Sequence, residues 1–265
     1  MQDKNQLSII WQVMDNLEML NFAREAAQKA GDRLRGITAR RVNSDAANDV
    51  KLQEDVESEI FIRGLLAQTG IEVVGEEKGG DASLISRKEP YWVVDPIDGT
   101  FNFLRGLPNV SVSIGLMRGM EPIVGAVYDF TRGEMFSGGR EFGLFLNGEK
   151  VSPRWAKSRA QAVVMTGFPS ITDYSDENMK RFVKRMQTFK KVRMCGSAAI
   201  ACAWVASGRA DCYDERGINL WDIAAGLALI EGAGGVWKCE GAGIEGRPLT
   251  FNLQLACREE FYIKD

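Results

Sequence analysis

Several carboxylates lie at the predicted ends of strands and starts of helices. Carboxylate oxygens are preferred ligands of Mg²⁺, Ca²⁺ and Mn²⁺. The clearest group lies in YWVVDPIDGTFNF (91–103), where an apolar strand delivers Asp95. The proline and glycine that follow favour a tight turn, so Asp98 lies across that turn from Asp95. If Gly99 and Thr100 open a helix, their amides point toward an anion.

Other carboxylates follow or begin further predicted elements. They are Glu76 and Glu77 in GEEKGG (75–80), Asp222 in NLWDIAAGLALIEGAGG (219–235), and Asp49 and Asp55 in DVKLQEDVESE (49–59). Taken singly, each fits an ordinary turn, a solvated loop, a helix cap or an acidic helix face. Brought together, they would repel one another unless cations neutralised them. The set therefore predicts a phosphate site with several Mg²⁺ ions, which act as Lewis acids and activate water.

The chain contains no histidine, which excludes phosphohistidine phosphatases, His-ligated metal sites and Ser-His-Asp hydrolases. With a net charge of -3, the chain lacks the excess of positive charge that is typical of a nucleic-acid binder. Five cysteines without a CxxC pair indicate neither a disulfide framework nor a zinc site. Metal chemistry in this protein must therefore rely on oxygen ligands.

The first part of the chain, residues 1–150, is predicted to form helices followed by a mostly antiparallel sheet that carries most of the metal ligands. Apolar spacing predicts helices over 7–34 and 49–66, and strands over 71–75, 91–95, 109–117 and 122–130. Two further strands meet at Asn147-Gly148, a strong hairpin signal.

The second part, residues 151–265, alternates strands and helices, which is typical of an α/β subdomain. The predicted helices cover 176–188, 197–208 and 222–235, and the strands cover 161–168, 192–196, 210–215 and 251–257. This part carries Asp222 and a candidate substrate loop.

The N-terminus has no basic stretch followed by an apolar one, so no signal peptide is indicated. The longest apolar run, 198–206, falls far short of the roughly 20 residues that a membrane span needs. We expect a cytoplasmic protein with neither a membrane nor a nucleic acid as partner.

In their order along the chain, the Glu-Glu pair, WVVDPIDGTFNF and WDIAAGLALIEGAGG resemble the inositol monophosphatase family. The hairpin GLFLNGEKV is also similar to that family, and the resemblance spans roughly 49–235. It implies an α/β (α+β) fold, a layered αβαβα sandwich of the inositol monophosphatase and fructose-1,6-bisphosphatase type. It also implies a homodimer, two or three Mg²⁺ ions and inhibition by Li⁺.

The same resemblance assigns roles to individual residues. The first Mg²⁺ would bind Glu76, Asp95 and the Ile97 carbonyl, the second would bind Asp95, Asp98 and Asp222, and a third would bind Glu76 and water. Asp55 and Thr100 would orient the attacking water near Glu76, and the amides of Gly99 and Thr100 would hold the phosphate. Asp98, Gly196, Ser197, Ala198 and Glu215 would contact the substrate.

Three positions depart from the family pattern. The family usually carries D-x-V-T-x-x-D where this chain has Asp49 to Asp55, with Leu52 in place of the threonine. Ser44 stands where a lysine is common, and Phe101 replaces a second threonine. These changes bear on water activation and the substrate loop more than on the metal cage.

The predicted reaction is hydrolysis of a small phosphate monoester by in-line attack of water, without a covalent intermediate. Asn102-Phe103 resembles the inositol branch of the family, which favours inositol monophosphate or a related sugar or polyol phosphate. Fructose 1,6-bisphosphate, a nucleotide 3′-phosphate and histidinol phosphate are alternatives within the superfamily. A haloacid-dehalogenase-type phosphatase would need D-x-D rather than D-x-x-D spacing. A non-catalytic regulatory protein on the same fold is the remaining alternative.

Overall fold

The computed structural model describes residues 16–46, 49–168, 172–241 and 247–263. The α-helices are α2 (Asn16–Arg35), α3 (Gln53–Leu66), α4 (Thr100–Arg105), α5 (Asp176–Met186), α6 (Ala198–Ala206) and α7 (Leu220–Gly232). The strands are β1 (Val42–Ala46), β2 (Asp49–Leu52), β3 (Glu72–Gly75), β4 (Pro90–Asp98), β5 (Ser111–Arg118), β6 (Glu121–Asp129), β7 (Glu134–Gly139), β8 (Gly143–Leu146), β9 (Glu149–Val151), β10 (Val163–Met165), β11 (Lys191–Arg193), β12 (Cys212–Asn219), β13 (Val236–Glu240) and β14 (Thr250–Ala256).

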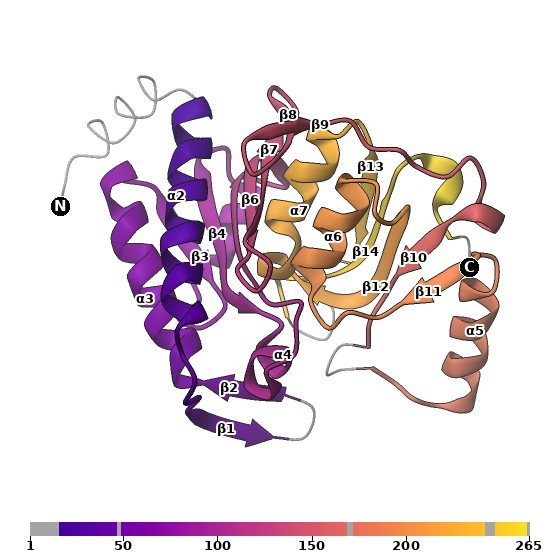
Figure 1. Cartoon of the computed structure of the whole chain (residues 1–265), viewed down its shortest axis with the longest axis horizontal. Coiled ribbons are helices and arrows are strands. Elements are labelled where there is room, and N and C mark those ends of the chain that lie inside the picture. The colour runs from indigo at the N-terminus through magenta and orange to yellow at the C-terminus, as the bar shows by residue number, and fades with distance from the viewer. Residues whose placement is uncertain (1–15, 47–48, 169–171, 242–246, 264–265) are drawn as a thin grey trace.

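Helices and sheets alternate in five layers (Figure 1). Helices α2 and α3 cover one face of a seven-stranded sheet of order β3-β4-β5-β6-β7-β8-β9. Helices α6 and α7 lie between that sheet and a five-stranded sheet of order β11-β10-β12-β14-β13, whose far face is covered by α5. One apolar core lies beneath α2 and α3, a second surrounds α6 and α7 between the two sheets, and a third lies beneath α5, so the predicted αβαβα sandwich is confirmed.

Strand β4 lies inside the larger sheet and is buried on both faces. Trp92 and Val94 pack into the core beneath α2 and α3, whereas Tyr91 and Val93 pack into the core that includes α6 and α7. Side chains alternate between the two faces of a strand, so a strand covered on both sides is apolar throughout. This burial fixes the path of β4 up to its last residue, Asp98.

Helix α7 lies unusually close to the larger sheet because glycines face it. Gly115 and Gly125 are opposite each other in the β5–β6 ladder. A Cβ at Gly115 would lie 2.8 Å from the backbone nitrogen of Ala225, and one at Gly125 would overlap the carbonyl oxygen of Ala225. The first turn of α7, which carries Asp222, is therefore held directly against the sheet.

The helix predicted to start at residue 49 starts instead at Gln53, and Asp49–Leu52 form strand β2, which pairs with β1. Leu52 is extended, with φ of -110° and ψ of 157°, and its N–H donates to the Asp55 carboxylate at 2.8 Å. The Asp55 carboxylate prevents the helix from starting earlier, because it binds the Leu52 N–H that an additional N-terminal turn would use for its own hydrogen bond. Of the helix predicted over 7–34, the structure shows Asn16–Arg35, and residues 1–15 lie outside the described part.

The end of α7 and the strand after it also differ from prediction. The helix covers Leu220–Gly232 rather than 222–235, and strand β13 was missed. Gly234 has φ of +83°, a left-handed conformation that ends the helix and reverses the chain into β13. The division of the chain near residue 150 stays a prediction.

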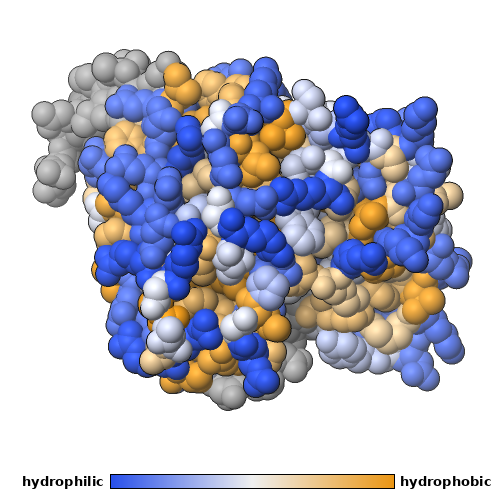
Figure 2. Space-filling model, viewed as in Figure 1, coloured by the Kyte–Doolittle hydropathy of each residue, from blue (hydrophilic) through white to orange (hydrophobic). Residues whose placement is uncertain are grey.

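Hydrophilic residues cover much of the face seen in Figure 2, with apolar patches among them. None of the helices in the described ranges is both long enough and apolar enough to cross a bilayer.

We predict that Gly125→Ala destabilises the protein by about 1–3 kcal/mol, because the added methyl group forces α7 away from the sheet. Gly64→Ala is the matched control, since Gly64 lies on an exposed face of α3 with no atom within 4 Å of an added Cβ. That change should stabilise the protein by about 0.5–1 kcal/mol. Urea unfolding measures both, and equal midpoints for the two variants would contradict the close packing of α7.

Candidate metal centre

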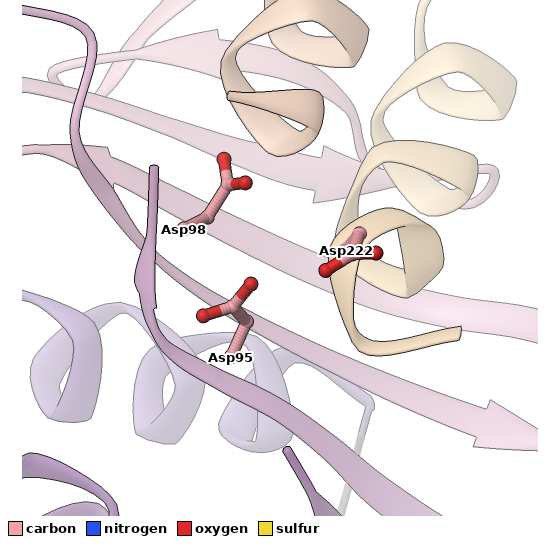
Figure 3. A group of neighbouring side chains, drawn as sticks. All are labelled: Asp95, Asp98 and Asp222. Atoms are coloured by element: carbon pink, nitrogen blue, oxygen red, sulfur yellow. The ribbon is translucent and has the colours of Figure 1, made fainter. Parts of the chain in front are cut away.

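Three aspartates meet where the end of β4 faces the first turn of α7. Each of Asp95, Asp98 and Asp222 offers a carboxylate oxygen, and these three oxygens lie within 4.8 Å of one another. Figure 3 shows the two β4 side chains and the α7 side chain directed toward a shared space. Residues far apart in sequence thus form one cluster that could hold a metal ion.

A break in the β4–β5 ladder brings the first two aspartates to the same side. Asp95 pairs with Ser113 and Asp98 pairs with Ser111, with a shift of register between them. The Ile97 N–H donates to Asp95 Oδ1 at 3.0 Å, which forms the turn expected of this sequence at Asp95. The irregularity adds a residue to β4, so two carboxylates three positions apart reach one site.

The carboxylate of Asp98 is held by the start of α6. The Ala198 and Ala199 N–H groups donate to it at 3.1 and 2.9 Å, and the Ser197 hydroxyl donates to it as well. Ser111 adds a hydroxyl donor at 3.3 Å. Asp98 therefore does not cap its own turn. Ser197 and Ala198, predicted to contact substrate, bind this carboxylate in the structure, and their role toward substrate stays a prediction.

Asp222 occupies the third position of α7 and is not its N-cap. The N-cap is Asn219, whose N–H donates to Asp222 Oδ2 at 2.9 Å. This reciprocal arrangement fixes the carboxylate at the helix start and leaves its other oxygen available to the cluster.

Glu76 follows β3, the neighbour of β4 in the sheet, and its N–H donates to the Val94 carbonyl at 3.3 Å. Burial raises the pKa of the Glu76 side chain, and the charge of Asp222 raises it further. Glu76 and Glu77 therefore do not lie in a solvated loop, since the Glu77 side chain is only 7% exposed.

Two residues of α3 hold the loop that carries Glu76. Glu59 is fully buried, and its carboxylate accepts the N–H groups of Glu77 and Lys78 at 2.7 and 3.1 Å. Arg63 pairs with Glu59 at 2.7 Å and donates to the Val73 carbonyl at 2.9 Å. Sequence analysis missed both, although Asp55, Glu59 and Arg63 are spaced four apart and so share one helix face.

Asp55 lies on α3 and is buried, not part of a solvated acidic face. One of its oxygens accepts the Leu52 N–H, and the other lies 3.4 Å from the Thr100 hydroxyl. That hydroxyl also donates to the Ile97 carbonyl at 3.0 Å. The structure thus places Asp55, Thr100 and the Ile97 carbonyl together, beside the end of β4.

Gly99 begins α4 in a left-handed conformation, with φ of +91°. A Cβ there would lie 2.8 Å from the Asn109 carbonyl oxygen and 3.1 Å from that of Gly196. Only glycine fits this turn. Gly196, at φ of +71°, therefore borders the turn that was predicted to hold phosphate.

Burial is the largest cause of raised carboxyl pKa values in this cluster, and mutual repulsion adds to it. The pKa of Asp55 rises to about 7, with the charge of Glu77 contributing, and the pKa of Asp222 rises to about 7, with that of Asp98 contributing. The pKa values of Glu76, Asp95 and Asp98 are raised too. These oxygen donors fit a hard divalent cation, which would remove the repulsion that now favours protonation.

Glu215 on β12 lines a cavity of about 230 Å³. Burial raises its pKa to about 8, and the charges of Asp222 and Asp98 contribute, so this side chain is coupled electrostatically to the acidic cluster. The Tyr213 hydroxyl donates to Glu215 at 2.8 Å. Phe168, whose ring is tilted against that of Phe182 with centroids 4.8 Å apart, adds an apolar surface to the cavity.

Comparisons of sequence and of structure with known proteins point to the same family. A family model for the inositol monophosphatase family matches residues 15–252. An inositol monophosphatase of Mesembryanthemum crystallinum is 34% identical over 229 residues, which cover 83% of this chain and 84% of that protein. A Xylella fastidiosa protein named Nus factor SuhB is 35% identical over 203 residues, which cover 76% of this chain and 71% of that protein. The solved structure of inositol monophosphatase from Anabaena superposes with a TM-score of 0.75 at 30% identity, covering 93% of this chain and 94% of that one.

We predict that the metal-free protein loses stability as the pH rises toward 8. Asp55 and Asp222 keep protons in the folded state up to about pH 7, whereas the unfolded chain releases them near pH 4, so stability falls between these values. We expect the melting temperature in EDTA to be about 5 °C lower at about pH 8 than at about pH 5, and Mg²⁺ to reverse most of this loss.

Scanning calorimetry at both pH values, with and without Mg²⁺, measures the effect. The absence of histidine helps, because no imidazole titrates in this range. A melting temperature that does not depend on pH in EDTA would contradict the repulsion among these carboxylates.

Proposed function

The chain belongs to the inositol monophosphatase family of phosphatases, and from this membership we propose that it hydrolyses a sugar or polyol phosphate monoester with Mg²⁺ held by its acidic cluster. The observation that carries the proposal is the convergence of Asp95, Asp98 and Asp222 on one point. Carboxylates from β4 and α7 would not be buried together at this cost unless a cation joined them.

The proposed ligands divide into two overlapping sets. Glu76, Asp95 and the Ile97 carbonyl would hold one ion, and Asp95, Asp98 and Asp222 would hold a second. The Thr100 hydroxyl donates to the Ile97 carbonyl, which supports the view that this oxygen faces the site. When bound, the ions would polarise the phosphoryl group, lower the pKa of a water and neutralise charge on the leaving oxygen.

Asp55 and Thr100 are the proposed positioning pair for the attacking water. The Leu52 N–H fixes one oxygen of Asp55, so the other is directed to the Thr100 hydroxyl. A carboxyl group with a pKa of about 7 can accept a proton near neutral pH, as general-base catalysis requires. The rigid turn at Gly99 would offer its amides to the phosphate beside this pair.

The cavity beside Glu215 is the proposed site of the alcohol part of the substrate. A carboxylate can accept hydrogen bonds from hydroxyl groups, and an aromatic ring can cover the apolar face of a sugar or polyol. Glu215 and Phe168 both line the cavity and supply these two features. This combination favours inositol monophosphate or a related sugar phosphate over an ester with a purely apolar alcohol.

Relatives named inositol monophosphatase and relatives named Nus factor SuhB are about equally similar to this chain, so the names do not select between catalysis and a regulatory role. The clustering of Asp95, Asp98 and Asp222 in this chain favours catalysis. Phosphate release from inositol monophosphate, fructose 1,6-bisphosphate, a nucleotide 3′-phosphate and histidinol phosphate would rank the substrates.

We predict that Asp95→Asn lowers phosphate release by at least about a hundredfold, because Asp95 belongs to both proposed ligand sets. Asp81→Asn is the control: Asp81 is exposed, begins a short helical turn outside the cluster, and should leave the rate unchanged. Steady-state assays with Mg²⁺ compare the two. Full activity in the Asp95 variant would contradict the proposed set of metal ligands.

We predict that Glu215→Gln lowers kcat/KM for a polyol phosphate about tenfold when the assay is run above about pH 8, where Glu215 is ionised and a hydrogen bond to its charge contributes about 1.5–3 kcal/mol. An aryl phosphate without hydroxyl groups should be affected much less. Tyr213→Phe keeps the carboxylate and loses only its donor, so its effect should be smaller. An equal loss on both substrates would show that Glu215 does not contact the alcohol.

A further inference from the structure

A lysine side chain reaches the acidic cluster from the β1–β2 hairpin. Lys51 Nζ lies 3.1 Å from Glu77 Oε1, and the Glu77 side chain is only 7% exposed. The pair joins β2 to the loop after β3, segments 26 positions apart in sequence. Surface ion pairs contribute little because water screens them, whereas a partner as buried as Glu77 is screened much less.

Glu77 cannot easily move away from Lys51. Its N–H donates to the buried Glu59 carboxylate at 2.7 Å, and Arg63 holds Glu59 in turn. The loop therefore presents Glu77 at a fixed position next to the proposed ligand Glu76, and the ammonium group is held there with it.

The ion pair lies on the loop that carries the proposed ligand Glu76. Glu77 directly follows Glu76 in the chain, after β3 ends at Gly75. Lys51 and Glu77 thus place a pair of opposite charges on that loop.

We propose that Lys51 is a built-in counter-ion of the metal centre, standing where a further divalent ion would otherwise bind beside Glu76 and Glu77. A fixed positive charge repels a divalent cation and already neutralises Glu77. The metal centre then takes two Mg²⁺ ions, and not three. The inference rests on the proposed metal cage and concerns how many ions it holds.

Calorimetric titration of the full metal-free chain with Mg²⁺ tests this without any measurement of turnover. We expect two ions to bind the unaltered protein and three to bind Lys51→Met, with total affinity increased about tenfold by removal of the repelling charge. Lys51→Arg keeps the charge and should bind two. Should Lys51→Met fail to fold by circular dichroism, Lys51→Gln is measured with the same expectation.

Glu77→Gln provides a test in the opposite direction. It removes the negative charge that faces the Lys51 ammonium group, so the repulsion of a nearby cation increases and Mg²⁺ binding should weaken about tenfold. General damage to the loop would weaken binding in both variants, whereas the proposal requires Lys51→Met to strengthen it. Lys78→Met, which removes an exposed lysine of the same loop, should match the unaltered protein.

The outcomes separate the two proposals. If the unaltered chain binds no Mg²⁺, the metal cage itself is wrong. If it binds three ions, or if Lys51→Met binds two with unchanged affinity, the cage stands and Lys51 is not its counter-ion.

Discussion

Repulsion among buried carboxylates is the constraint on which the rest of this structure depends. Left to themselves, acids in this position would turn toward water, so the fold has to hold each in place. It does so in one recurring way: backbone N–H groups bind each of four carboxylates, at one oxygen in Asp55, Asp95 and Asp222 and at both oxygens in Asp98. The donors belong to Leu52 for Asp55, Ile97 for Asp95, Ala198 and Ala199 for Asp98, and Asn219 for Asp222. The metal centre is thus assembled from the starts of helices and the end of a strand.

The same requirement explains why so much of the packing around the centre uses residues without side chains. Helix α7 can bring Asp222 to β4 only because Gly115 and Gly125 leave room for its backbone. Gly75 likewise leaves room for the Glu59 carboxylate that holds the loop of Glu76. A methyl group at any of these positions would separate elements that must lie within a few ångströms. Packing density therefore determines the electrostatics of the site.

The resemblance to the family predicted the layered fold, and local sequence signals identified the clustered aspartates. The alternation within β4 and the turn after Asp95 are such signals. The predicted start of α3 was wrong because apolar spacing alone does not show whether Asp49–Leu52 is a strand or the first turn of a helix. The pairing of this segment with β1 makes it a strand. Glu59 was missed because its role depends on backbone N–H groups 18 and 19 positions away, which no local pattern reveals.

The structure explains one departure from the family pattern, the serine at position 44. Ser44 lacks the expected basic side chain, yet the β1–β2 register places Lys51 directly opposite it. Directly opposed residues of an antiparallel pair project from the same face of the hairpin. The Lys51 side chain therefore projects from the same face of the hairpin as Ser44, but from the neighbouring strand, and its ammonium group reaches Glu77. The aspartates of β4 and α7 are held by elements packed into the core, whereas the Glu77 end of the cluster is neutralised from the hairpin.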